Sequence, residues 1–182
     1  MATLYFNGAV DNDWATLDNW WTDATFTTPA TSLPSSSDSV IASSNIASNS
    51  GSEPNIVNFT LTGYISIEIT VTGMATFNED SRLEEGTITG DCTFNHTSRH
   101  DNIGNIIGNC IFNDNSYLFA PVDGNCIFND NAIFKGDASN NIVSGSITFN
   151  NNSKNITNIT ADNIVVNRKI VGIANSDILG IS

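Results

Sequence analysis

Basic residues are scarce in this chain of 182 residues, which has only 6 Lys and Arg against 19 Asp and Glu. The formal net charge of -13 excludes a cationic nucleic-acid binder, because phosphate neutralisation needs clustered Lys and Arg. Long apolar runs are also missing, and none approaches the roughly 20 residues of a membrane-spanning helix. Strong helix formers are few while Asn, Ser, Thr and Gly are abundant, which excludes a helical bundle.

What the sequence has instead is neutral polar and aromatic residues. There are 27 Asn and 10 Phe, and 40% of the residues are hydrophobic, which opposes disorder. The start, Met1 to Tyr5, has neither the basic residues nor the apolar stretch of a signal peptide. We therefore expect a folded protein made in a cytoplasm without a signal peptide.

A repeat of about 17 residues with the pattern [IV]-x-G-x-small-x-F-N-x-x-S runs through the second half of the chain. Its Phe residues are spaced by 17, 18, 16 and 21 residues, and a degenerate sixth copy covers residues 162–167. Repeats at a fixed period indicate stacked structural units. The five clear copies begin at Gly73, Gly90, Gly108, Gly124 and Gly145.

Each copy predicts one short strand and one turn. The alternation in Gly-x-Cys-x-Phe is typical of a strand, and the following Asn and polar residues are typical of a turn. About 17 residues are too few for a propeller blade of about 40 but suit one coil of a solenoid. We predict an all-β protein: a parallel β-solenoid (β-helix) of about 16–18-residue coils over residues 55–182, following a non-repeating N-terminal attachment or cap module over residues 1–54.

Stacking converts repeat positions into columns of like side chains. Phe and the small residue two positions before it share strand parity, so we assign both to the core. The Asn after each Phe is expected to form a hydrogen-bonded amide ladder. The core ladder is Phe77, Phe94, Phe112, Phe128, Phe149, Cys92, Cys110 and Cys126, and the Asn ladder is Asn78, Asn95, Asn113, Asn129 and Asn150.

A third column, of opposite parity, contains only β-branched residues. Either β-propensity alone explains it, or it is a self-association face, because an outward column without charge suggests cover by another surface. With inverted parity, Phe and Cys would instead line the axis of an intertwined oligomer. The interface candidates are Thr76, Thr93, Ile111, Ile127, Thr148 and Val165.

The residues whose side chains could serve as metal ligands or catalytic groups have structural explanations. The cysteine spacings of 18 and 16 follow the repeat, which predicts buried thiols rather than a metal site. Asp114 and Asp130 share a column at a separation resembling that of a retaining glycosidase, but two turn acids explain them equally. His96 and His100 have no nucleophile nearby. We expect no catalytic residue, no metal and no cofactor, hence no enzyme.

The N-terminal module contains all three Trp residues, Trp14, Trp20 and Trp21, which indicate either a compact core or a particle-attachment surface. Together with the G-x-a-x-F-N-D-x-S repeats behind it, this module resembles virion surface proteins of tailed bacteriophages, including trimeric capsid-decoration proteins and tail fibres with β-helical parts. The residues that carry the resemblance are Tyr5-x-Asn7-Gly8, Trp14, Asn19-Trp20, Leu33-Pro34 and Asp38-x-Val40.

The resemblance implies a homotrimeric capsid-decoration (cement) protein on the exterior of a bacteriophage particle. Its partners would be other copies of itself and the major capsid protein or another virion protein, with no nucleic acid and no membrane. The alternative is a receptor-binding tail fibre or surface adhesin, which predicts exposed aromatic residues at loop tips. The candidates for those are Tyr117, Phe119 and Phe134.

Overall fold

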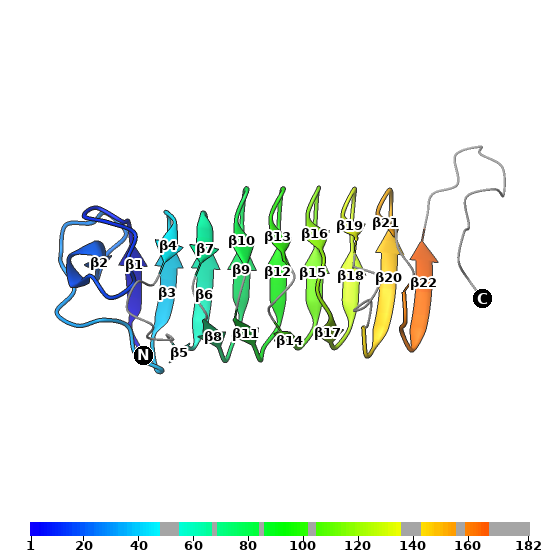
Figure 1. Ribbon diagram of the computed structural model, residues 1–182, viewed down its shortest axis with the longest axis horizontal. Helices are drawn as coiled ribbons and strands as arrows, with labels where there is room; N and C mark the ends of the chain where they lie inside the picture. Colours follow the sequence, from blue (N-terminus) through cyan, green and yellow to red (C-terminus); the bar gives the residue numbers. More distant parts are fainter. Residues whose placement is uncertain are drawn as a thin grey trace.

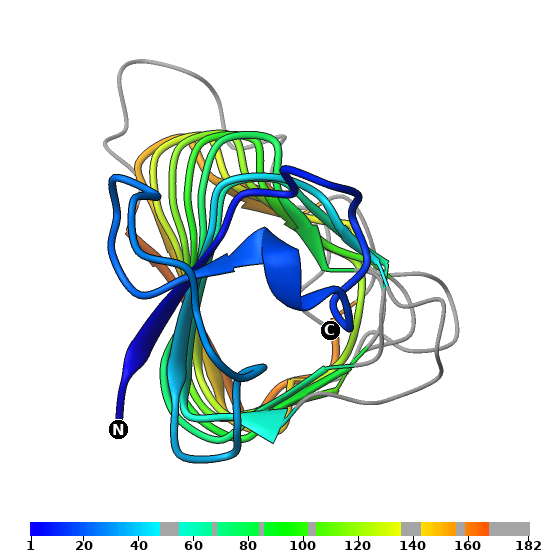
Figure 2. The same ribbon diagram turned by 90° about the vertical axis from the view of Figure 1, so that its left-hand side faces the viewer.

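The computed structural model describes residues 1–47, 55–66, 69–83, 86–101, 105–135, 143–155 and 159–167. They form a parallel β-solenoid with three sheets along its length, which confirms the predicted fold class (Figure 1). Viewed from its N-terminal end, the solenoid shows the three sheets enclosing a common interior (Figure 2). Every strand pair is parallel except β1 with β2.

The three sheets, named A, B and C here, differ in length. Sheet A has ten strands in the order β2 (Trp20–Trp21), β1 (Thr3–Phe6), β3 (Ser39–Ala42), β6 (Asn58–Leu61), β9 (Ala75–Phe77), β12 (Cys92–Phe94), β15 (Cys110–Phe112), β18 (Cys126–Phe128), β20 (Ser146–Asn150) and β22 (Asn163–Asn167). Sheet B has seven: β21 (Lys154–Asn155), β19 (Ile133–Phe134), β16 (Tyr117–Leu118), β13 (Arg99–His100), β10 (Arg82–Leu83), β7 (Tyr64–Ser66) and β4 (Ile46–Ala47). Sheet C has five: β17 (Val122–Asp123), β14 (Asn105–Ile107), β11 (Thr87–Ile88), β8 (Thr70–Val71) and β5 (Asn55–Ile56).

The repeat determines the register of sheet A. Each repeat strand pairs with the next so that like residues lie opposite one another, as in Cys92 with Cys110 and Phe94 with Phe112. Because side chains alternate along a strand, the Phe and small columns both point into the solenoid and are buried. Aliphatic residues of sheets B and C, such as Leu83 and Ile88, complete the same core.

The corner between sheets A and B is a tight turn with a left-handed residue. The residue after each of the Asn residues Asn78, Asn95, Asn113, Asn129 and Asn150 has a positive φ. The side chain there is a carboxylate in three coils, an imidazole in one and an amide in one. These residues are Glu79, His96, Asp114, Asp130 and Asn151, with φ between 54° and 58°.

The corner before each of the five repeat strands of sheet A needs glycine because successive coils touch there through their backbones. A Cβ on Gly108 would overlap the carbonyl oxygen of Gly90, and one on Gly124 would overlap that of Gly108. The repeat glycines therefore mark the positions of closest approach between coils.

The solenoid begins earlier than the expected boundary between residues 54 and 55. Strand β1 pairs in parallel with β3, and β3 pairs in parallel with β6, so the N-terminal region supplies the first strands of sheet A. Between β1 and β3 the chain forms the 3₁₀ helix η1 (Leu17–Asn19) and the antiparallel strand β2, which lie across the end of the solenoid (Figure 2). The expected final portion, residues 168–182, lies outside the described residues.

Candidate functional site: the outward face of sheet A

The outward face of sheet A carries one central column of side chains, one from each of its parallel strands. All are uncharged, and all but the first are threonine, isoleucine or valine. The column contains the six interface candidates expected from the repeat and extends three strands further toward the N-terminus. It comprises Tyr5, Ile41, Thr60, Thr76, Thr93, Ile111, Ile127, Thr148 and Val165.

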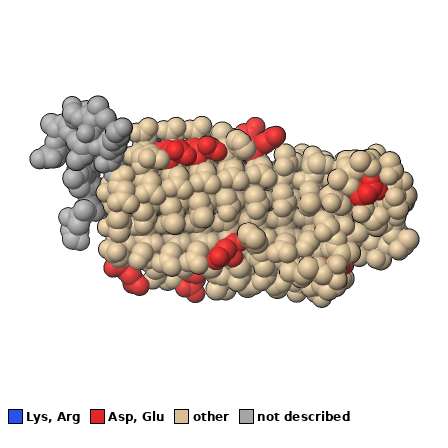
Figure 3. All heavy atoms as spheres, turned by 180° about the vertical axis from the view of Figure 1, so that it is seen from behind, with Lys and Arg blue, Asp and Glu red and all other residues tan. Residues whose placement is uncertain are grey.

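The isoleucines of this column are open to solvent. Ile41, Ile111 and Ile127 are 37%, 37% and 38% exposed, although they stand in the middle of a regular sheet. Figure 3 shows this face as a broad surface without Lys or Arg, with Asp and Glu confined to its margins. A contiguous uncharged face is unusual on a chain of net charge -13, and such patches mark contact sites.

One margin of the face is the expected asparagine ladder. Each side-chain Nδ2 donates to the Oδ1 of the asparagine one coil earlier, over 2.8 to 3.0 Å. The amides therefore satisfy one another along the solenoid axis and also fix the spacing of the turns. The ladder is Asn78, Asn95, Asn113, Asn129, Asn150 and Asn167.

The opposite margin has a second ladder, which the sequence reasoning missed. The backbone N–H and Nδ2 of Asn109 both donate to Oδ1 of Asp91, over 2.9 and 3.1 Å. Asn125 makes the same pair of bonds to Oδ1 of Asn109, and the N–H of Ser146 donates to Asn125. The signal was a polar residue directly after the repeat glycine, in the position that the pattern left as x.

The two ladders make the face suitable for contact with another protein. Side-chain amides that are already bonded to one another lose less when water is removed than free amides would. Between them lie methyl groups, whose burial is favourable. Nine parallel strands at about 4.8 Å by five residues at about 3.3 Å give a planar area of roughly 700 Å². Stable interfaces bury about 800 Å² of accessible surface per partner, so the face has a comparable size.

The Phe and Cys columns lie inside the chain's own solenoid, so they do not line an intertwined oligomer axis. Phe112 is fully buried and stacks on Phe94 at 4.9 Å and on Phe128 at 4.8 Å between ring centroids, with interplanar angles of 4° and 8°. Phe77 and Phe149 continue the stack at its ends. Cys92, Cys110 and Cys126 are free, buried thiols. Burial, with the neighbouring thiols, raises the pKa of Cys110 well above its usual range, which keeps it protonated and unreactive.

Two of the three tryptophans are buried and are not available for an attachment surface. Trp14 and Trp20 are buried, 4.7 Å apart between ring centroids, and Trp20 Nε1 donates to the Trp14 carbonyl over 2.9 Å. Phe6 packs on the edge of Trp20 and joins this cluster to the core. Only Trp21 is partly exposed, against Phe26. Trp14 and Trp20 were wrong as attachment candidates, because the loop that carries them folds back over the end of the solenoid.

The three aromatic residues expected at loop tips also differ in burial. Phe134 is fully buried, whereas Tyr117 and Phe119 are partly exposed on the sheet B side. His100 is buried beside Phe94, and burial lowers its pKa to about 4, so the ring is neutral at pH 7. His96 is exposed in the corner turn, whereas His100 is buried. The two histidines therefore do not share a site.

The acidic cluster at the N-terminal cap organises a loop. Asn19 Nδ2 donates to Asp11 Oδ1 over 2.7 Å and the N–H of Asp13 donates to the same oxygen over 2.9 Å. These bonds, that from Asn19 above all, lower the pKa of Asp11. In the described part of the chain, no group of three or more His, Cys, Asp or Glu is placed to hold a metal ion. No helix among the same residues has the length and apolarity needed to cross a membrane.

Comparison of the chain with protein families, with curated proteins and with solved structures finds no match in any of the three.

Proposed function

We propose that this chain is a non-enzymatic structural protein of a bacteriophage particle, a homotrimeric capsid-decoration protein whose copies contact one another through the outward face of sheet A. The observation that carries the proposal is the uncharged column from Tyr5 to Val165, whose three isoleucines are open to solvent and which is bordered by ladders of hydrogen-bonded amides. The resemblance of the N-terminal module and the repeats to virion surface proteins supports the assignment of the chain to a bacteriophage particle.

The proposed mechanism is stabilisation by added contact area. A protein that binds only the assembled shell shifts the equilibrium toward that shell by mass action. The remaining acidic surface gives the particle a negatively charged exterior, which opposes aggregation of particles. Since Trp14 and Trp20 are buried, we assign the contact with the particle to exposed apolar residues of the end cap. These are Val10, Leu17 and Leu33, whose side chains are 62%, 38% and 37% exposed.

Sedimentation equilibrium of the purified chain and of two matched variants tests self-association. Ile111→Lys places a charge in the middle of the sheet A face, whereas Ile107→Lys places one on sheet C, where Ile107 is 48% exposed. Burying an unpaired ammonium costs several kcal/mol, so Ile111→Lys should weaken association more than 100-fold. The native chain and Ile107→Lys should give about 58 kDa, three times the 19.5 kDa chain. Equal effects of the two variants would contradict the assignment of the face.

Density-gradient sedimentation with purified phage capsids tests whether the chain binds the capsid. The native chain should travel with the capsid band and raise the temperature at which capsids release DNA. Val10→Asp, in the end cap, should stay at the top of the gradient while Ile107→Lys travels with the band. A chain that binds host cells and leaves capsids unbound would reject the decoration function in favour of the receptor-binding one.

A further inference from the structure

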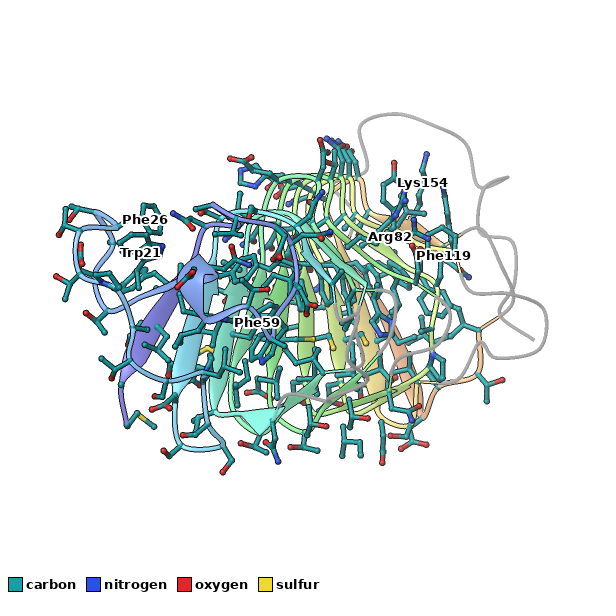
Figure 4. All side chains as sticks on the ribbon, turned by 60° about the vertical axis from the view of Figure 1, so that its left-hand side comes forward. Trp21, Phe26, Phe59, Arg82, Phe119 and Lys154 are labelled. Atoms are coloured by element: carbon teal, nitrogen blue, oxygen red, sulfur yellow. The ribbon has the colours of Figure 1, made fainter. Side chains whose placement is uncertain are left out.

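The basic residues of this acidic chain gather on one face. All four Lys and Arg among the described residues belong to sheet B or follow its strands directly: Arg82, Arg99, Lys135 and Lys154. Register stacks the side chains of one outward column in the order Arg82, Arg99, Tyr117, Ile133 and Lys154. Figure 4 shows Arg82, Phe119 and Lys154 on the same side of the solenoid. We call this surface the sheet B stripe.

The middle of the stripe combines rings with a cation. The Lys135 ammonium lies 4.3 Å from the centroid of the Tyr117 ring and 5.5 Å from that of Phe119. The two rings lie 6.4 Å apart and 29° from parallel, so they form one gently bent apolar platform. Both rings are partly exposed, so a ligand can reach them from solvent.

The described part of the stripe carries an ion-pair cluster and two further cations. Asp101 accepts from both Arg82 and Arg99. Lys135 and Lys154 add two ammonium groups. Because the rest of the chain is strongly acidic, a concentration of cations here favours a ligand of opposite charge at this face alone.

We infer that the sheet B stripe binds a linear anionic polysaccharide along the solenoid axis. Sugar rings present C–H faces that stack on aromatic platforms such as Tyr117 and Phe119, and their carboxylate or sulfate groups pair with Lys and Arg. From Arg82 to Lys154 the stripe spans four strand spacings, about 19 Å, which suits several sugar units in a row. Duplex DNA carries a charge about every 1.7 Å, so along the roughly 19 Å of the stripe it has many more charges than the four described cations can pair with. This inference does not depend on the proposed function.

Isothermal titration of the full chain with defined polysaccharides tests the inference. The probes are polymannuronate for carboxylate, dextran sulfate for sulfate, and neutral dextran of the same length as the control. At least one anionic polymer should bind with a measurable Kd, and dextran should not. Since the long-range repulsion is screened beyond about 8 Å at physiological ionic strength, binding should persist at 0.15 M salt and weaken only at higher salt. Failure of both anionic polymers to bind at 1 mM overturns the inference.

Two variants and two further polymers separate this site from nonspecific attraction. Lys154→Gln and Tyr117→Ala should each raise Kd at least tenfold, while Ile107→Lys, which adds a cation to sheet C, should leave it unchanged. Circular dichroism of each variant verifies the fold. Polyglutamate and single-stranded DNA should bind at least tenfold more weakly than the better polysaccharide, because they do not offer sugar faces at this spacing. Equal binding of polyglutamate, or a Kd unmoved by both Lys154→Gln and Tyr117→Ala, overturns the inference.

Discussion

The phenylalanine stack makes a quantitative prediction about coupling between neighbouring coils. Replacing Phe94 and Phe112 by Leu, singly and together, removes the ring contact of 4.9 Å and 4° between them. An aromatic pair contributes about 0.5–1.5 kcal/mol beyond its buried area, so this double-mutant cycle should give a coupling energy of about 1 kcal/mol. The distant pair Phe94 and Phe149 is three strand spacings apart, about 14 Å, where effects should add.

Urea unfolding followed by far-ultraviolet circular dichroism measures these energies. Each variant must keep the slope of the native chain, because a changed slope would signal a change in the unfolded surface or in cooperativity. Phe112→Ala sets the scale and should cost about 3–5 kcal/mol, as for other fully buried Phe residues. Zero coupling for the adjacent pair, or equal coupling for the adjacent and distant pairs, would refute the stacked arrangement.

Three further predictions concern single positions. Gly108→Ala should lower the free energy of unfolding by about 3 kcal/mol or more, because the new methyl group overlaps the Gly90 carbonyl. In the same urea assay, Asn115→Ala on the exposed turn of the same coil should change this free energy by less than about 0.5 kcal/mol. His100→Leu should remove a pH dependence of stability. The pKa of His100 is about 4 in the folded chain and 6.5 in the unfolded chain, so the free energy of unfolding of the native chain should fall by about 3 kcal/mol relative to the variant between pH 6.5 and pH 4. Parallel stability curves in that range would contradict this. Asn113→Ala breaks the bonds to Asn95 and Asn129 and should cost about 2 kcal/mol in thermal unfolding, an effect that an isolated surface amide would not show.

The sequence was informative where the period is regular. The Phe and Asn columns from residue 77 onward follow directly from like residues at spacings near 17, because parallel register places them opposite one another. Strands β1 and β3 were not recognised as part of the ladder, since the cap loop separates them and Phe6, Ala42 and Leu61 share only their apolar character.

The remaining features depend on contacts that no period encodes. Trp14 and Trp20 are buried because a non-repeating loop folds over the end of the solenoid. The sheet B stripe was hidden because coils of unequal length place Tyr117 and Lys154 at irregular spacings, although Arg82 and Arg99 are 17 residues apart.

Cysteine protection is the most direct test of the sheet A face as a contact surface. The native thiols are buried, so Ile111→Cys and Ile107→Cys each introduce one accessible thiol, on sheets A and C respectively. Maleimide labelling is compared between dilute chain and the assembled oligomer. Assembly should slow labelling of Ile111→Cys at least tenfold and leave labelling of Ile107→Cys unchanged. Unslowed labelling of Ile111→Cys in an oligomer of proven size would contradict a contact through the sheet A face.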